Sequence, residues 1–119
     1  MKIGDYGAHI MEIIFVYMTA GDRSEARKIG KALIEMKLAA CVNIIDSMTS
    51  LYEWKGQVQE DQETVLIAKT TMEKIPALKQ KVAEIHSYEC PCILTFTVSD
   101  GHEPFMRWIK AQVGQNVAS

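Results

Sequence analysis

One segment concentrates the residue types that bind metal ions in proteins: His86-Ser87-Tyr88-Glu89-Cys90-Pro91-Cys92. An imidazole, a carboxylate and two thiols are the donors that copper or zinc uses. The spacing is atypical, because one residue separates Cys90 from Cys92 and no second cysteine pair completes a four-ligand site. The other interpretation is structural: His86 favours the negative carboxyl end of a helix, and Pro91 ends that helix before the next strand.

Cys41 lies inside the apolar run 39–45, where a free cysteine usually packs as a small hydrophobic side chain. A role as a ligand for a soft metal is the alternative interpretation. The chain has three cysteines, and this odd number fits a reducing compartment better than a disulfide framework. We therefore expect a cytoplasmic protein.

A second group of polar and aromatic residues flanks the turn signal Lys55-Gly56. Its members are Tyr52, Trp54, Glu60, Asp61, Glu63 and Lys69. In one interpretation the carboxylates solvate a hairpin and Lys69 marks the end of a strand. In the other, a lysine close to acids and aromatic rings in a cleft between subunits binds a small polar ligand or a hydrated cation. Both interpretations stay open at this stage.

Composition limits the partners. Thirteen basic and fifteen acidic residues give a formal net charge of −2, and no stripe of Lys and Arg interleaves with aromatic residues. Neither nucleic acid nor an anionic membrane is therefore an expected partner. No apolar stretch approaches the ~20 residues of a membrane span. Residues 1–10 have no periodicity and are interpreted as an N-terminal extension, with residues 11–119 forming a single domain.

Hydrophobic periodicity predicts an alternating order of strands and helices. Asp22 and Glu25 form a capping box that opens a helix, and Pro76 requires the second helix to begin near Glu73. The expected strands are 12–18, 38–45, 63–69 and 93–99, with a bend at 46–50, a hairpin around residues 55–56 and a C-terminal helix around 105–113. This order predicts an α+β, ferredoxin-like βαββαβ antiparallel sheet with the two main helices on one face.

The strands 13–18, 39–45 and 65–68 are almost continuously apolar, whereas two helices can cover only one face of the sheet. A wet second face would leave several large side chains without the roughly 1.5 to 3 kcal/mol that burial of each contributes. The working unit is therefore expected to be an oligomer.

An enzymatic role is tested against the predicted fold. A ferredoxin-like domain of this size suits an acylphosphatase-type hydrolase, which needs an anion-binding loop after the first strand. Gly21 and Arg23 offer such a loop superficially, but Asp22 would place a negative charge beside the phosphate. The chain contains no nucleophile elbow, P-loop or dinucleotide fingerprint. We expect no enzyme and keep the hydrolase as a third hypothesis.

Four motifs in register then resemble one known family. They are Leu38-Ala39-Ala40-Cys41-Val42-Asn43-Ile44, Ser50-x-Tyr52-x-Trp54-Lys55-Gly56, Glu60-x-x-Glu63 with Lys69-Thr70, and His86-x-Tyr88-Glu89-x-Pro91-x-Ile93. In this order, and from Met11 to about Val113, they resemble the CutA divalent-cation tolerance family. The resemblance implies a homotrimer of ferredoxin-like subunits around a threefold axis, the architecture of the PII signalling proteins.

The resemblance also implies a function, which is non-enzymatic tolerance to divalent cations with binding of copper. It implies an intersubunit cleft built from Tyr52, Trp54, Glu60, Glu63, Lys69, His86 and Tyr88. The metal ligands that we predict are His86, Cys41, Cys90, Cys92 and Glu89. The chain departs from the family at Ala20 and Gly21, where a cysteine and a proline are common, and Cys90 and Cys92 are additions. The rival hypothesis is a PII-like signalling trimer that binds a small anionic metabolite beside Lys69.

Overall fold

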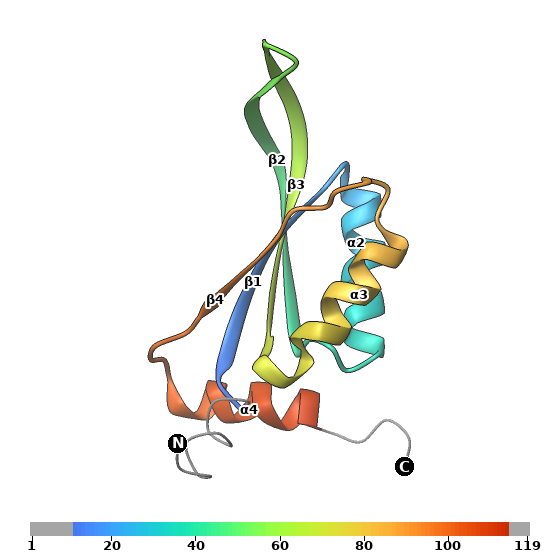
Figure 1. Cartoon of the computed structure of the whole chain (residues 1–119). Helices are drawn as coiled ribbons and strands as arrows, with labels where there is room; N and C mark the ends of the chain where they lie inside the picture. The colour runs from blue at the N-terminus through green and yellow to red at the C-terminus, as the bar shows by residue number, and fades with distance from the viewer. Residues whose placement is uncertain (1–10, 115–119) are drawn as a thin grey trace.

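The structure is a computed structural model that describes residues 11–114, so the predicted extension 1–10 lies outside the described residues. The elements follow the order β1 (Ile13–Ala20), α2 (Arg23–Glu35), β2 (Cys41–Trp54), β3 (Gln57–Thr71), a 3-10 helix η1 (Met72–Lys74), α3 (Ile75–Ile85), β4 (Ile93–Thr97) and α4 (Glu103–Gly114) (Figure 1). The order βαββαβ is the predicted one, with α4 as the additional C-terminal helix.

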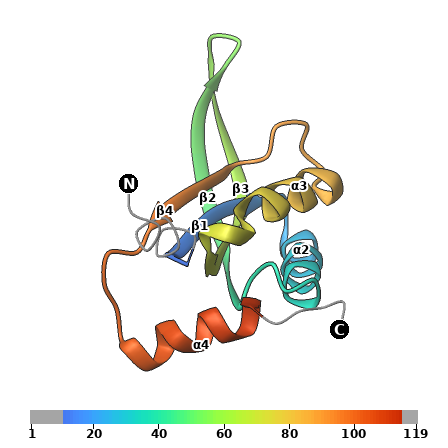
Figure 2. The ribbon, with the colours of Figure 1, turned by 60° about the horizontal axis from the view of Figure 1, so that its bottom comes forward.

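The four strands form one antiparallel sheet in the order β2-β3-β1-β4. β1 is central, and both of its neighbours come later in the chain. Helices α2 and α3 lie on one face of the sheet, while α4 lies at the end of the sheet away from the hairpin tip (Figures 1 and 2). The predicted α+β sheet with both main helices on one face is therefore confirmed.

Helix α2 begins where its capping residues predict. Asp22 Oδ1 accepts a 2.8 Å hydrogen bond from the Glu25 amide. The reciprocal bond differs from the predicted capping box, because Glu25 Oε1 accepts from the Gly21 amide at 2.9 Å, one residue before the cap. Apolar residues at helical spacing then bury one face of α2 against the sheet; they are Ala26, Ile29 and Leu33.

Helix α3 begins two residues later than predicted. Regular α-helix starts at Ile75, and the residues before it form η1. Pro76 lacks an amide hydrogen, and starting the helix at Ile75 places Pro76 in the first turn, where no intrahelical bond is required of it. Leu78 and Val82 then face the core and are fully buried.

The predicted bend at 46–50 is wrong, because β2 continues through it to Trp54. A bulge between Ile45 and Met48 absorbs the irregularity, and Ser47 there has φ +61°. The predicted turn is confirmed: Lys55 has φ +51° and Gly56 φ +78°, the positive values that a tight type I′ hairpin needs. The outer parts of β2 and β3, residues 48–63, form a two-stranded arm that projects from the body (Figure 1).

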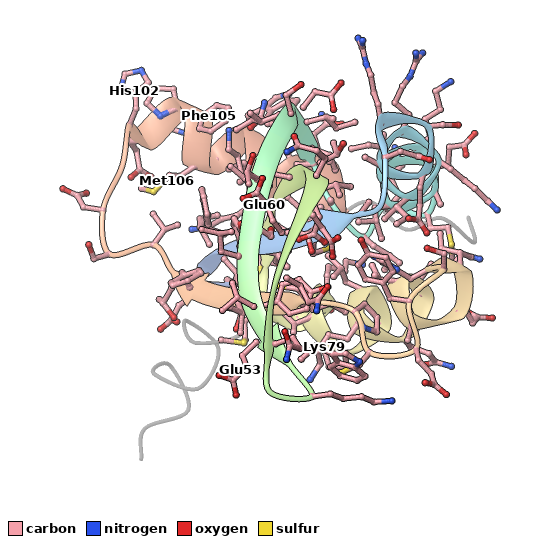
Figure 3. All side chains as sticks on the ribbon, turned by 90° about the horizontal axis from the view of Figure 1, so that it is seen from above. Glu53, Glu60, Lys79, His102, Phe105 and Met106 are labelled. Atoms are coloured by element: carbon pink, nitrogen blue, oxygen red, sulfur yellow. The ribbon has the colours of Figure 1, made fainter. Side chains whose placement is uncertain are left out.

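The two faces of the sheet differ in what covers them. The helix-side face of β1 carries Ile14, Val16 and Met18, which are almost completely buried. The other face carries Phe15 and, on β4, Leu94 and Phe96, whose side chains are 55% and 53% exposed. Figure 3, seen from above, shows α4 on the other side of the strands from α3. We call the face of the sheet that carries Phe15, Leu94 and Phe96 the open face.

Candidate functional site

The largest concentration of predicted site residues lines one cavity of about 640 Å³ that runs along one side of the arm. The arm supplies one wall, and the loop between α3 and β4 supplies the other. The lining residues are Thr19, Tyr52, Trp54, Gln59, Asp61, Glu63, Tyr88, Glu89, Cys90 and Cys92. The fold thus brings together two segments that the sequence had singled out separately.

The arm presents its aromatic residues through strand alternation. Tyr52 pairs with Gln59 and Trp54 with Gln57, so the two rings lie on the same face of the hairpin. The Tyr52 hydroxyl donates a hydrogen bond to the Asp61 carboxylate on the neighbouring strand. This bond, with burial and the nearby carboxylates, raises the pKa of Tyr52. The exposed phenol therefore acts as a neutral hydrogen-bond donor.

Glu63 connects the arm to the loop. Its Oε1 accepts a 2.5 Å hydrogen bond from Ser50 Oγ, and its Oε2 accepts a 2.9 Å bond from the Tyr88 hydroxyl. Burial raises the pKa of Tyr88 to about 12, with further contributions from the hydrogen bond and the charge of Glu63. Glu63 therefore accepts hydrogen bonds from two separate elements.

His86 is the C-cap of α3, and its ring is enclosed by backbone groups. Nε2 lies 2.7 Å from the Thr19 carbonyl oxygen, and Nδ1 accepts a 3.0 Å hydrogen bond from the Tyr88 amide. Because Nδ1 is an acceptor, the proton belongs on Nε2, which donates to Thr19. Metal binding through His86 would require one of these two bonds to break.

Glu25, on α2, contacts the loop between α3 and β4. Its Oε2 accepts a 2.6 Å hydrogen bond from the Ser87 amide, while Oε1 accepts one from the Gly21 amide. His86 Nδ1 lies 3.7 Å from Oε2. Burial alone would raise the pKa of Glu25, but the hydrogen bonds from Gly21 and Ser87 outweigh burial, so the pKa is lowered. The sequence identified Glu25 only as a capping residue, and its contact with the loop was missed.

The two additional cysteines both reach the cavity. Cys90 is exposed and Cys92 is partly buried. Burial, followed by the charge of Glu63, raises the pKa of the Cys92 thiol, although a hydrogen bond with Thr19 opposes this. Because its side chain is exposed, Cys90 is the more accessible of these two thiols.

Three predicted site residues lie away from this cavity within one chain. Cys41 is half-buried and pairs with Lys69, six residues along β3 from Glu63, or about 20 Å at strand spacing. The Lys69 ammonium group lies 5.6 Å from the ring centre of Phe105 on α4. Glu60 pairs with Leu51 and so occupies the opposite face of the arm from Tyr52.

The metal-donor residues do not form a complete centre within one chain. Among residues 11–114, no group of three or more His, Cys, Asp or Glu side chains is placed to hold a metal ion. Of the carboxylates in the cavity, Asp61 and Glu63 accept hydrogen bonds from hydroxyl groups, and His86 next to the cavity bonds to backbone groups. A metal ion would therefore need rearrangement of these bonds or ligands from a second subunit.

The fold and the cavity together define a class of protein: a small α+β domain with an acidic, thiol-bearing and aromatic cleft. The CutA1 divalent ion tolerance protein family matches residues 14–112 of the sequence. The chain belongs to this family. It is 41% identical over 99 residues to the divalent-cation tolerance protein CutA of Thermus thermophilus, covering 83% of this chain and 96% of that protein.

Other relatives extend the comparison. The chain is 37% identical over 102 residues to human protein CutA, covering 86% of this chain and 56% of the human protein. It therefore spans little more than half of that relative. The solved CutA1 structure from Ehrlichia chaffeensis superposes with a TM-score of 0.83 at 30% identity, covering 86% of this chain and 95% of that one. The solved Thermus thermophilus protein gives 0.82 at 40% identity, covering 84% and 97%.

The comparisons leave the compartment open. A relative from Arabidopsis thaliana is described as chloroplastic, and a solved structure from Archaeoglobus fulgidus is described as periplasmic. No helix within residues 11–114 is long and apolar enough to cross a membrane. The cytoplasmic location stays a prediction from cysteine usage.

Proposed function

We propose that this protein is a non-enzymatic divalent-cation tolerance protein that works as a homotrimer and binds copper or another divalent cation at the arm cavity. One observation carries the proposal: two thiols and three carboxylates line one cavity, and the described lining residues include no Lys or Arg. The acidic members are Asp61, Glu63 and Glu89. Such a cleft favours a cation over an anion.

The open face supports assembly. Leu94, Phe96 and Ile45 are all more than half exposed in a single chain, and α2 and α3 cover only the opposite face. Burial of these side chains against another copy would stabilise the assembly by roughly 1.5 kcal/mol or more for each. The number of subunits, three in a PII-like arrangement, comes from the family resemblance.

The proposed ligands differ with the oxidation state of copper. Copper(I) favours thiolates, so Cys90 and Cys92 are its proposed ligands. A harder divalent cation favours the carboxylates of Glu63 and Glu89. His86 joins only if its bond to Tyr88 or Thr19 opens. Cys41, which lies elsewhere in one chain, would contribute only from a neighbouring subunit.

Metal analysis tests the proposal directly. Protein purified without chelator is analysed for bound metal, and copper(I) is then titrated under anaerobic conditions. We expect Cys90→Ser combined with Cys92→Ser to abolish tight copper(I) binding, whereas the matched Cys41→Ser variant retains it. A wild-type protein that neither carries nor takes up any divalent cation or copper(I) would refute the proposal.

The PII-like alternative makes a different prediction for Lys69. This residue is the only Lys or Arg in the predicted cleft, and in one chain it packs on Phe105 instead of facing the cavity. The geometry of one chain therefore favours the cation. Calorimetric titration with ATP and with pyrophosphate separates the two: binding that is lost in Lys69→Gln but unchanged in the double cysteine variant would support the metabolite.

A further inference from the structure

The outer side of α2 carries a basic stripe that the cation-binding proposal does not use. Arg23, Arg27, Lys28 and Lys31 are all exposed and, with Ser24, line a surface hollow of about 630 Å³. Within the described part of the chain, none of these four cations forms an ion pair. The chain has a net charge of −2, but these four neighbouring cations make the electrostatic potential at the surface of α2 positive.

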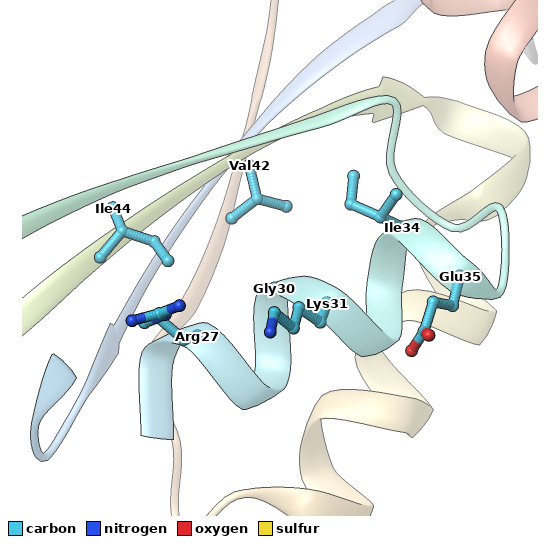
Figure 4. A pocket seen from close by; sticks show the side chains of 7 residues that line it. All are labelled: Arg27, Gly30, Lys31, Ile34, Glu35, Val42 and Ile44. Atoms are coloured by element: carbon cyan, nitrogen blue, oxygen red, sulfur yellow. The ribbon is translucent and has the colours of Figure 1, made fainter. Parts of the chain in front are cut away.

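An apolar groove borders the stripe. It has a volume of about 510 Å³ and lies between α2 and the edge strand β2 (Figure 4). Val42 and Ile44 point from β2 toward α2, and Ile34 completes the apolar lining. Arg27 and Lys31 line both the groove and the basic hollow. The charged and apolar surfaces are therefore continuous.

Gly30 forms the floor of the groove, where α2 approaches β2 closely. A Cβ atom added at Gly30 would lie 3.3 Å from Val42 Cγ1, closer than an ordinary contact, so glycine allows an approach that a larger residue would hinder. Beyond this contact, Ile34 and Ile44 remain 39% and 36% exposed. An apolar side chain from a partner would bury both.

The spacing of the cations matches an extended peptide. Arg23, Arg27 and Lys31 recur every four residues, or about every 6 Å along the helix axis. In an extended chain, side chains on one side recur about every 6.6 Å. We propose that this surface binds an extended acidic peptide segment, with alternate carboxylates on the α2 cations and the intervening apolar side chains on Val42 and Ile44.

Two features favour a peptide over other anionic partners. The groove wall is apolar, which suits neither a phosphate backbone nor a free inorganic anion. Glu35 lies at one end of the groove and repels a longer acidic run, so the segment has about three carboxylates. The surface is on α2, apart from the arm cavity, so the proposal stands independently of cation binding.

The probe is a fluorescein-labelled Gly-Glu-Leu-Glu-Leu-Glu-Gly peptide, with binding followed by fluorescence anisotropy at low ionic strength. We expect saturable binding by the full chain that weakens as salt is added. Arg27→Gln combined with Lys31→Gln should weaken it about fivefold to tenfold, because two exposed ion pairs are lost. The matched variant Lys79→Gln with Lys110→Gln removes the same charge elsewhere and should bind normally.

Two further comparisons test the apolar part. A peptide with Ser in place of Leu, and the variant Ile34→Ser with the original peptide, should each bind several-fold more weakly. The proposal is overturned if the original peptide does not bind saturably, if both charge variants weaken binding equally, or if removing leucine has no effect. Tighter binding of a thymidine oligonucleotide or phosphatidylglycerol vesicles at the same cations would also overturn it.

Discussion

Replacing Glu25 with glutamine should loosen the loop that carries Tyr88, Glu89, Cys90 and Cys92. In the native chain, one carboxylate accepts from the Gly21 amide at 2.9 Å and the Ser87 amide at 2.6 Å. Glutamine keeps the size of the side chain but presents an NH₂ group to one of these amides. Two donors then face each other, and one hydrogen bond is lost.

The magnitude follows from the type and exposure of these bonds. A hydrogen bond to a charged group contributes about 1.5 to 3 kcal/mol. Both amides are exposed, so water replaces part of what is lost. We therefore expect the free energy of unfolding to fall by about 1 to 2 kcal/mol, which lowers the melting temperature by roughly 4 to 10 °C.

The loss of stability caused by Glu25→Gln should become smaller as the pH falls. The pKa of Glu25 is lowered in the folded chain below its ordinary value of 4.5, so its contribution is fully present above that value. The contribution is lost as the pH falls through the folded-state pKa, where the protonated carboxyl resembles glutamine. The difference between wild type and Glu25→Gln is thus constant near neutral pH and closes in acid.

Thermal unfolding at fixed protein concentration over a pH series measures this difference. Glu84→Gln, an exposed change on α3, is the matched control and should melt like the wild type. Hydrogen exchange should also rise at residues 87–92 in the Glu25 variant. Identical melting at neutral pH, or a difference that persists unchanged in acid, would refute the account of Glu25 given above.

Three shorter predictions concern the open face and the cavity. Phe96→Asp, at a side chain already 53% exposed in one chain, should leave the subunit folded but abolish assembly in light scattering; an unchanged mass would contradict the open-face interface. Tyr88 should ionise with a midpoint of about 12 in ultraviolet absorbance, and Glu63→Gln should lower that midpoint; an unmoved midpoint would remove Glu63 as a cause. Native thiol labelling should modify Cys90 faster than Cys41, and copper(I) should slow it at Cys90; the reverse order, or no protection, would exclude a thiolate site.

Local chemistry made much of the fold predictable. Asp22 caps α2, Pro76 marks the first turn of α3, and the Lys55-Gly56 turn forms where the sequence indicated. Each of these signals depends on neighbours within a few residues. The boundary errors arose where a local rule met a tertiary constraint, as at Ser47, where a bulge allows β2 to continue past a polar segment that was predicted to bend.

The site was predicted as a list of residues but not as an arrangement. Tyr52, Glu63 and Tyr88 converge because the arm and the α3–β4 loop meet in three dimensions. Alternation along the arm separates Glu60 from them, and strand length separates Lys69. The Glu25 contact with Ser87 joins residues 62 apart in sequence, and no periodic pattern records such a contact. The sequence gives the residue types, whereas the distances between residues far apart in the chain can be known only from the tertiary structure.

The position of β1 has a consequence for synthesis of the chain. Among the four strands of this sheet, β1 is synthesised first, and its partners β3 and β4 are both made later. A nascent chain that ends before residue 57 carries an apolar central strand with neither neighbour present. At about 5 to 20 residues per second, the time between synthesis of β1 and synthesis of β3 is a matter of seconds. Slow translation over residues 21–56 should therefore increase the demand for chaperones, whereas slow translation after β4 should not.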